Sequence, residues 1–266
     1  MPSDPPAKRL ELPGGVVTWT DEGQGVTVVA LHGLPGSVRD FRWLAPALRD
    51  GVRFVRIDQP GFGGTALSSG PGSGLPARAD FVCAVIDALD LGPVVLMGHS
   101  MGGAVAAAVA ARRPDLVSSL VLVCSIGIKK HRGMKFWPIP PQIVSVLLRV
   151  GPLRRRLLPN LRAAFEKSGF KGHEDQAILQ TVHCVAGTSF ALHERHLRSL
   201  RVPTMLVWTK DDPMIEESIS DKLYWICPAG PRVVFEDGGH NPQKAKAVEL
   251  AAALTAWIAN RPGTDR

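Results

Sequence analysis

Short apolar runs alternate with longer helix-like stretches along most of this 266-residue chain. Such alternation is typical of βαβ units, in which helices cover both faces of a parallel sheet and leave its strands uniformly apolar. The expected strands cover residues 9–12 and 16–19, paired as a hairpin, and then 26–31, 52–57, 94–97, 120–123, 205–208 and 233–235. The expected helices include residues 41–48, 77–89, 102–112, 216–226 and 244–260. The sequence therefore predicts an α/β fold with a mostly parallel, doubly wound sheet.

One interval interrupts this alternation. Between the expected strands at 120–123 and 205–208 the sequence has no strand-like run, but it has helical ones such as 142–150 and 175–186. Because long loops without structure are rare in compact domains, we interpret the interval as an inserted helical cap. We expect a core of residues 8–126 and 201–261, a cap of residues 127–200, and disordered tails at 1–7 and 262–266.

The most specific motif is Gly98-His99-Ser100-Met101-Gly102, which fits the G-x-S-x-G pattern. It lies between an expected strand and an alanine-rich expected helix, so Ser100 would occupy a sharp strand-to-helix turn. Glycines on both sides allow the close backbone approach that such a turn requires. The turn presents the hydroxyl at a helix N-terminus, where developing negative charge is stabilised. This context predicts that Ser100 is a nucleophile.

A serine hydroxyl is a weak nucleophile and needs a base beside it. In this motif class the acid and then the histidine follow the serine, each in a loop after a later strand. Asp211 and Asp212 follow the expected strand at 205–208, and His240 follows the one at 233–235. We therefore expect His240 to be the base, with Asp212 or Asp211 as the acid that orients it.

Together with two further segments, these residues resemble the α/β-hydrolase family over almost the whole chain. The segments are residues 32–36, HGLPG, and residues 58–63, DQPGFG. The resemblance implies an α/β-hydrolase fold, Asp212 as the triad acid, and backbone N–H groups of Leu34 and Met101 as donors to the oxyanion. The chain departs from the family pattern at Thr209, where glycine is common, and at Pro213, so Asp211 stays an alternative that otherwise caps a loop.

The resemblance also guides the choice of reaction. The leading interpretation is hydrolysis of a carboxylic ester or thioester through an acyl-enzyme, without a metal or cofactor. One alternative is cleavage of a carbon–carbon bond in a diketone-like substrate, and another is a ligand-binding receptor with little turnover. Epoxide hydrolases and dehalogenases of similar pattern use an aspartate nucleophile, so Ser100 argues against those activities.

The net charge of +7 is concentrated in the expected cap. Residues 127–200 hold 13 Lys and Arg against four Asp and Glu, whereas the remainder is slightly acidic. This asymmetry predicts either a solvated cap surface or an acidic partner: an anionic substrate, a carrier-bound acyl group or an anionic membrane surface. We do not expect nucleic acid, because the chain has no recognition motif.

The remaining features indicate ordinary structural roles. Four scattered cysteines lack a CxxC pair, and we interpret them as reduced and structural. His183, His193 and His196 lack a clear fourth ligand, so we interpret them as polar positions in the cap rather than metal ligands.

No apolar run is long enough to span a membrane, and the start of the chain has no secretory pattern. These features predict a cytoplasmic protein.

Overall fold

A computed structural model of the chain describes residues 3–67, 72–134 and 139–260. Within these residues a single eight-stranded sheet has the order β1-β2-β4-β3-β5-β6-β7-β8. The strands are β1 (Lys8–Leu12), β2 (Gly15–Gly23), β3 (Val26–Leu31), β4 (Val52–Ile57), β5 (Val94–His99), β6 (Val117–Val123), β7 (Thr204–Thr209) and β8 (Arg232–Phe235). Strand β2 is antiparallel to both of its neighbours, β1 and β4, and strands β3 to β8 are all parallel to one another.

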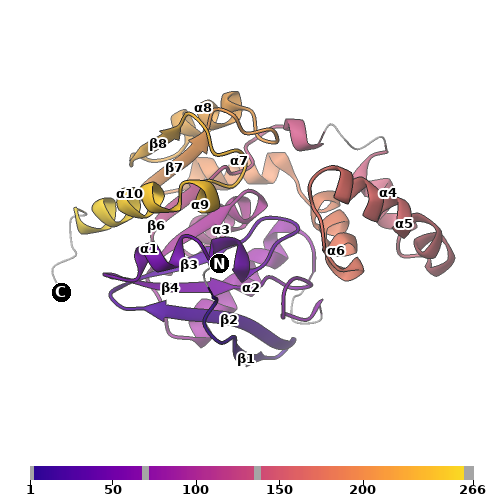
Figure 1. The fold of residues 1–266 in the computed structure, drawn as a ribbon, viewed down its shortest axis with the longest axis horizontal. Helices are drawn as coiled ribbons and strands as arrows, with labels where there is room; N and C mark the ends of the chain where they lie inside the picture. The colour runs from indigo at the N-terminus through magenta and orange to yellow at the C-terminus, as the bar shows by residue number, and fades with distance from the viewer. Residues whose placement is uncertain (1–2, 68–71, 135–138, 261–266) are drawn as a thin grey trace.

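The helices connect these strands and cover both faces of the sheet (Figure 1). They are the 3₁₀ helices η1 (Val38–Phe41) and η3 (Arg132–Met134), and the α-helices α1 (Ala45–Leu48), α2 (Leu75–Ala88), α3 (Met101–Arg112), α4 (Pro141–Leu147), α5 (Gly151–Lys167), α6 (Asp175–Ala186), α7 (Phe190–Ser199), α8 (Glu217–Ile226), α9 (Pro242–Ala245) and α10 (Ala247–Ala259).

Successive side chains of one strand enter two separate cores. In β3, Val29 and Leu31 pack in the core that includes α2, α3 and α8, whereas Val28 and Ala30 pack in the core that includes α1 and α10. Because side chains alternate along a strand, burial on both faces requires an unbroken apolar run. This two-sided burial confirms the predicted α/β fold with a mostly parallel, doubly wound sheet.

Within the described residues, η3 and the helices α4 to α7 lie between β6 and β7, where the sequence predicts the cap (Figure 1). We call residues 127–200, the expected cap, the cap segment. Helices α4, α5 and α6 share a small apolar cluster of their own, which contains Val144, Leu148 and Val182. Helix α7 instead packs against α3, and its Leu197 belongs to a core of the sheet. The cap boundary at residue 200 stays a prediction, with α7 packed on the core.

The N-terminal segment reaches the sheet at Arg56, whose side chain is completely buried in β4. Its guanidinium pairs with Asp4 at 2.7 Å and with Glu22 at 2.6 Å, and it donates to the carbonyl oxygen of Val38. Part of the expected tail at residues 1–7 therefore contacts the core, while residues 1–2 and the tail at 262–266 lie outside the described residues.

Replacing Arg56 with Met leaves the Asp4 and Glu22 carboxylates partly buried without a close cation, because the exposed Arg39 and Arg49 lie 3.9 Å and 3.7 Å from them. We expect Arg56→Met to lower the free energy of unfolding by about 3 kcal/mol in urea titrations. The control is Arg53→Met, because Arg53 lies on the same strand as Arg56 and pairs with Asp21 of β2, but its side chain is 36% exposed. Its loss should be below about 1 kcal/mol. Equal losses in the two variants would contradict the structural importance of the buried guanidinium.

Candidate active site

Ser100 lies on the sharp turn between β5 and α3, with φ 54° and ψ −121°. Few L-residues adopt a positive φ, so the surrounding packing must hold this conformation. A side chain at Gly98 would overlap the carbonyl oxygen of Gly102, and one at Gly102 would overlap the carbonyl oxygen of Leu31. The glycines are thus required by the close approach of strand, helix and neighbouring loop.

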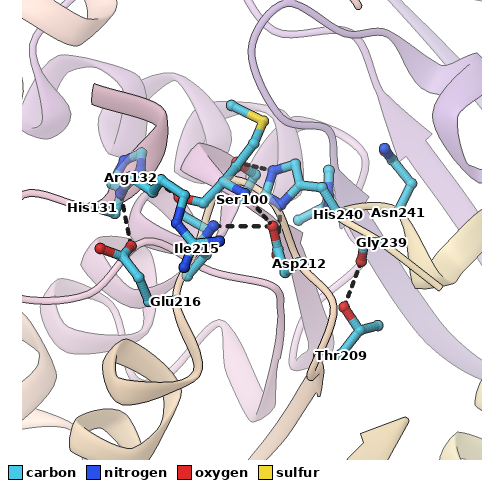
Figure 2. Close-up of polar contacts among 12 residues, drawn as sticks. Ser100, His131, Arg132, Thr209, Asp212, Ile215, Glu216, Gly239, His240 and Asn241 are labelled. Atoms are coloured by element: carbon cyan, nitrogen blue, oxygen red, sulfur yellow. Dashed lines mark hydrogen bonds and ion pairs between the residues drawn. The ribbon is translucent and has the colours of Figure 1, made fainter. Parts of the chain in front are cut away.

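His240 follows β8 and faces Ser100 across the end of the sheet (Figure 2). The Ser100 Oγ lies 2.9 Å from His240 Nε2, in position to donate its proton to the imidazole. On the other side of the ring, His240 Nδ1–H donates to Asp212 Oδ2 at 2.8 Å. Both His240 and Asp212 are buried. The structure therefore joins the three residues in one line of hydrogen bonds.

Asp212 follows β7, and its other carboxylate oxygen, Oδ1, also accepts hydrogen bonds. Oδ1 accepts the backbone N–H groups of Met214 at 2.7 Å and Ile215 at 3.0 Å. Burial raises the pKa of this carboxyl, but the hydrogen bond and charge of His240, with the two N–H donors, outweigh burial and place the pKa below its usual value. The carboxyl is therefore held as an anion beside the imidazole.

Asp211 lies in the same loop as Asp212, but it contacts the backbone of the loop that precedes His240. Its exposed carboxylate accepts the backbone N–H groups of Gly239 at 2.8 Å and Gly238 at 3.2 Å. Thr209 adds a hydrogen bond from its hydroxyl to the Gly239 carbonyl oxygen at 2.6 Å (Figure 2). Asp211 and Thr209 thus fasten the loop before His240, and Asp211 contacts backbone rather than the imidazole.

The loop after β3 lies directly beside Ser100. A Cβ added at Gly33 would lie 3.0 Å from His99 Nδ1 and 3.1 Å from the Ser100 Cβ, and Leu34 is the next residue of this loop. His32 anchors this loop, because its Nδ1 donates to the Gly33 carbonyl oxygen and its Nε2 accepts the Gln59 N–H. Burial lowers the pKa of His32, which keeps the neutral ring that this pairing needs.

Met101 is the first residue of α3, so the two expected oxyanion donors flank Ser100 from a loop and a helix. From the cap segment, Thr188 contacts the buried Met101 side chain through a hydrogen bond to its sulfur. The role of the Leu34 and Met101 N–H groups stays a prediction.

His99 is a functional neighbour that sequence reasoning missed. Its Nε2–H donates to the backbone carbonyl oxygen of His240 at 2.7 Å, and the two rings are 4.9 Å apart. Burial, followed by the adjacent His240, lowers the pKa of His99 to about 3. A neutral His99 can hold the His240 backbone without adding a second positive charge. Its variable position in G-x-S-x-G gave no signal of this role.

The start of the cap segment holds the loop that carries Asp212 (Figure 2). The buried ring of His131 donates to the Met214 carbonyl oxygen at 3.2 Å, and the Gly133 N–H donates to the same oxygen at 2.9 Å. The Arg132 N–H donates to Glu216 at 2.7 Å. Residues 131–133 and Glu216 therefore fix the acid loop through contacts that are distant in sequence.

The histidines of the cap segment do not gather around one point. His183 contacts Ser145, whereas His193 donates to the Ile126 carbonyl oxygen. Within the described residues, the one group with metal-ligand proximity is Cys124, Asp212 and His240. Burial, and then Asp212, raise the pKa of the Cys124 thiol, so the thiolate that binds metals is disfavoured. All four cysteines are free thiols.

Comparison with known proteins identifies the family. Residues 28–253 match the alpha/beta hydrolase family, which is most of the chain. The chain belongs to that family. The structure is similar to the esterase EaEST from Exiguobacterium antarcticum, with a TM-score of 0.77, 19% identity, and coverage of 95% of this chain and 99% of that one. At that identity the likeness supports the fold alone.

Two relatives with curated names indicate the range of activities among similar α/β hydrolases. The chain is 36% identical to the 2-hydroxy-6-oxo-2,4-heptadienoate hydrolase of Pseudomonas putida, over 87% of this chain and 89% of the relative. It is 25% identical to the monoacylglycerol lipase ABHD6 of Homo sapiens, over 91% of this chain and 78% of the relative. Membership of the hydrolase family is therefore firm, and the substrate class is a separate question.

The two adjacent aspartates allow a matched test of the acid. Asp212→Asn removes the anion that stabilises charged His240, and we expect kcat for hydrolysis of p-nitrophenyl acetate to fall about 10⁴-fold. Asp211→Asn keeps an oxygen acceptor for the glycine N–H groups and should leave kcat nearly unchanged. Thermal unfolding of both variants controls for folding. A larger loss of kcat in Asp211→Asn would transfer the role to that residue.

Proposed function

We propose that this α/β hydrolase cleaves a carboxylic ester, or the related thioester, through an acyl-enzyme on Ser100. The observation that supports the proposal most directly is the hydrogen-bonded line from the Ser100 hydroxyl through His240 to Asp212. Such a line provides a nucleophile, a base and an anion in the order that acyl transfer requires. A carboxylic-ester hydrolase of this kind is also consistent with the similarity of the chain to a relative named as a monoacylglycerol lipase.

In the proposed mechanism the Ser100 oxygen attacks the substrate carbonyl while His240 Nε2 takes the hydroxyl proton. The oxyanion that forms accepts hydrogen bonds from the Leu34 and Met101 N–H groups, each worth about 10²–10³ in rate for similar sites. His240 then gives its proton to the leaving alcohol or thiol, and the acyl group stays on Ser100. Water, deprotonated by His240, releases the acid and restores the serine.

The test is a panel of p-nitrophenyl esters with increasing acyl length. We expect the wild-type chain to turn over repeatedly on at least one ester, and we expect Ser100→Ala to lose about 10⁶-fold in kcat. The control is Ser118→Ala, a serine of β6 outside this site. Activity that survives in Ser100→Ala would contradict Ser100 as nucleophile, and no turnover on any ester would contradict the esterase.

A second candidate is hydrolysis of a carbon–carbon bond. It is favoured by the 36% identity to the heptadienoate hydrolase, which is higher than the 25% identity to the monoacylglycerol lipase. In this reaction the same serine and histidine would promote addition of water at a ketone, followed by release of a carbon leaving group. The geometry at Ser100 is compatible with both reactions.

The two candidates differ in measurable preference. The test substrate is 2-hydroxy-6-oxo-2,4-heptadienoate. If ester hydrolysis is the main activity, kcat/KM for this compound should be far below kcat/KM for the best p-nitrophenyl ester. Loss of the dienoate absorbance gives the rate, and Ser100→Ala gives the background. A kcat/KM that exceeds the ester value would make the carbon–carbon reaction the principal function.

A further inference from the structure

Helices α4 and α5 lie at one side of the molecule, away from the sheet (Figure 1). Helix α4 buries one face, through Val144, and Leu148 just after the helix is also buried. These side chains pack with Val182 of α6 and with half-buried leucines of α5 and α6. Helix α4 thus contributes to the small apolar cluster through one face only, and its opposite face does not pack in that cluster.

The opposite face is also apolar, although it faces solvent. On α4 the exposed side chains are Ile143 and Val146. The exposed Ile139 before the helix, Val150 after it and Leu153 at the start of α5 continue the series at intervals of three or four residues. Val146 is 61% exposed and Ile143 is 51% exposed. We call this set, together with Arg149, Arg154, Arg155 and Arg156, the tip surface. Clustering of large exposed apolar side chains on one protruding element is typical of an interaction site.

The same surface is strongly basic. Residues 139–156 hold four arginines and no Asp or Glu. The four arginines of the tip surface are exposed, and none pairs with a carboxylate within the described residues. By contrast, Arg162 pairs with Asp175 and Arg198 with Glu194, so acidic partners are available elsewhere in the same segment. The tip arginines are therefore available for an external anion.

Exposed aliphatic side chains with arginines beside them match the chemistry of an anionic lipid surface. The aliphatic groups can enter the boundary between headgroups and acyl chains, while the arginines remain with the lipid phosphates. Nucleic acid fits less well, because isoleucine and valine offer no ring on which bases stack. No helix among the described residues is long and apolar enough to cross a membrane, so the contact would be peripheral.

A cavity adjoins the tip surface. It has a volume of about 300 Å³, and its lining includes Arg154 of the tip surface, the exposed Leu67 and the apolar side chains of Leu148 and Leu179. The cavity therefore opens between the cap helices and a loop of the core, next to the basic and apolar residues. Its lining also includes the polar residues Gln176, Gln180 and His183.

We propose that the tip surface binds the chain peripherally to anionic membranes. Membrane binding would not depend on hydrolysis, because no residue of the tip surface takes part in the hydrogen bonds that join Ser100, His240 and Asp212. The exposed apolar side chains of α4 and the start of α5 would insert into the lipid interface, and the unpaired arginines would attract phosphate and other anionic headgroups. Binding should weaken as ionic strength rises, since the attraction is screened within a Debye length.

The test is co-sedimentation of the full chain with vesicles of phosphatidylcholine alone or with one quarter phosphatidylglycerol. Wild type should pellet with the anionic vesicles at low salt and remain in solution with the neutral ones. Val146→Asp should weaken binding by about tenfold, because it removes an inserting group and adds a negative charge. Replacing Arg155 and Arg156 together with Gln should weaken it by about fivefold per charge.

The matched control is Val248→Asp, because Val248 is 71% exposed on α10, outside the cap segment. It should bind vesicles as wild type does. Unchanged thermal unfolding and unchanged hydrolysis of a water-soluble ester would show that Val146→Asp remains folded. The proposal is overturned if wild type fails to pellet with anionic vesicles at low salt, or if Val146→Asp pellets equally well. A dimer that forms without lipid and dissociates in Val146→Asp would instead assign the surface to a second copy.

Discussion

The close packing of backbone around Ser100 is the constraint on which the site depends. The Ser100 N–H donates to Val123 at the end of β6, and the Ser100 carbonyl oxygen accepts from Ile126 just beyond it. On the other side, Gly102 lies against the carbonyl oxygen of Leu31 at the end of β3. The positive φ at Ser100 is thus held between two neighbouring strands, with no space for a side chain at the adjacent glycines.

The positions of His240 and Asp212 depend on loops that hydrogen-bond to one another. Thr209 at the end of β7 and Asp211 just after it bind the glycines before His240, and His99 binds the backbone of His240 itself. The beginning of the cap segment then holds the far side of the Asp212 loop through His131. Because each loop restrains the next, the distances at His240 follow from the fold rather than from any one contact.

Much of this arrangement could be predicted from the sequence, for identifiable reasons. The unbroken apolar runs located the parallel strands because both faces of the sheet are covered, and Ser100 was found because its motif lies between strand and helix. The pattern could not decide between Asp211 and Asp212, since neighbouring residues in a loop differ in direction only once the chain is folded. The contacts of His99 and His131 were missed because they join segments far apart in sequence.

Helix boundaries were harder to predict than strands. Of the expected helix at 41–48, only residues 45–48 form an α-helix, α1, and η1 ends at Phe41; the helix expected at 244–260 is divided into α9 and α10. Helix α5 was not anticipated as one element, and it contains Pro159 in its interior, a residue that usually ends helices. Packing against α6 and the cap cluster sustains it, which periodicity in a single sequence does not reveal.

We propose that Ser100 is the nucleophile of this hydrolase and that His240 activates it. This proposal can be tested by intact-protein and peptide mass spectrometry after reaction with a fluorophosphonate, which modifies activated serines covalently. We expect one adduct per chain, located on the peptide that contains Ser100, and much slower labelling in His240→Ala. An adduct on another residue, or labelling of Ser100 at an undiminished rate without His240, would contradict it.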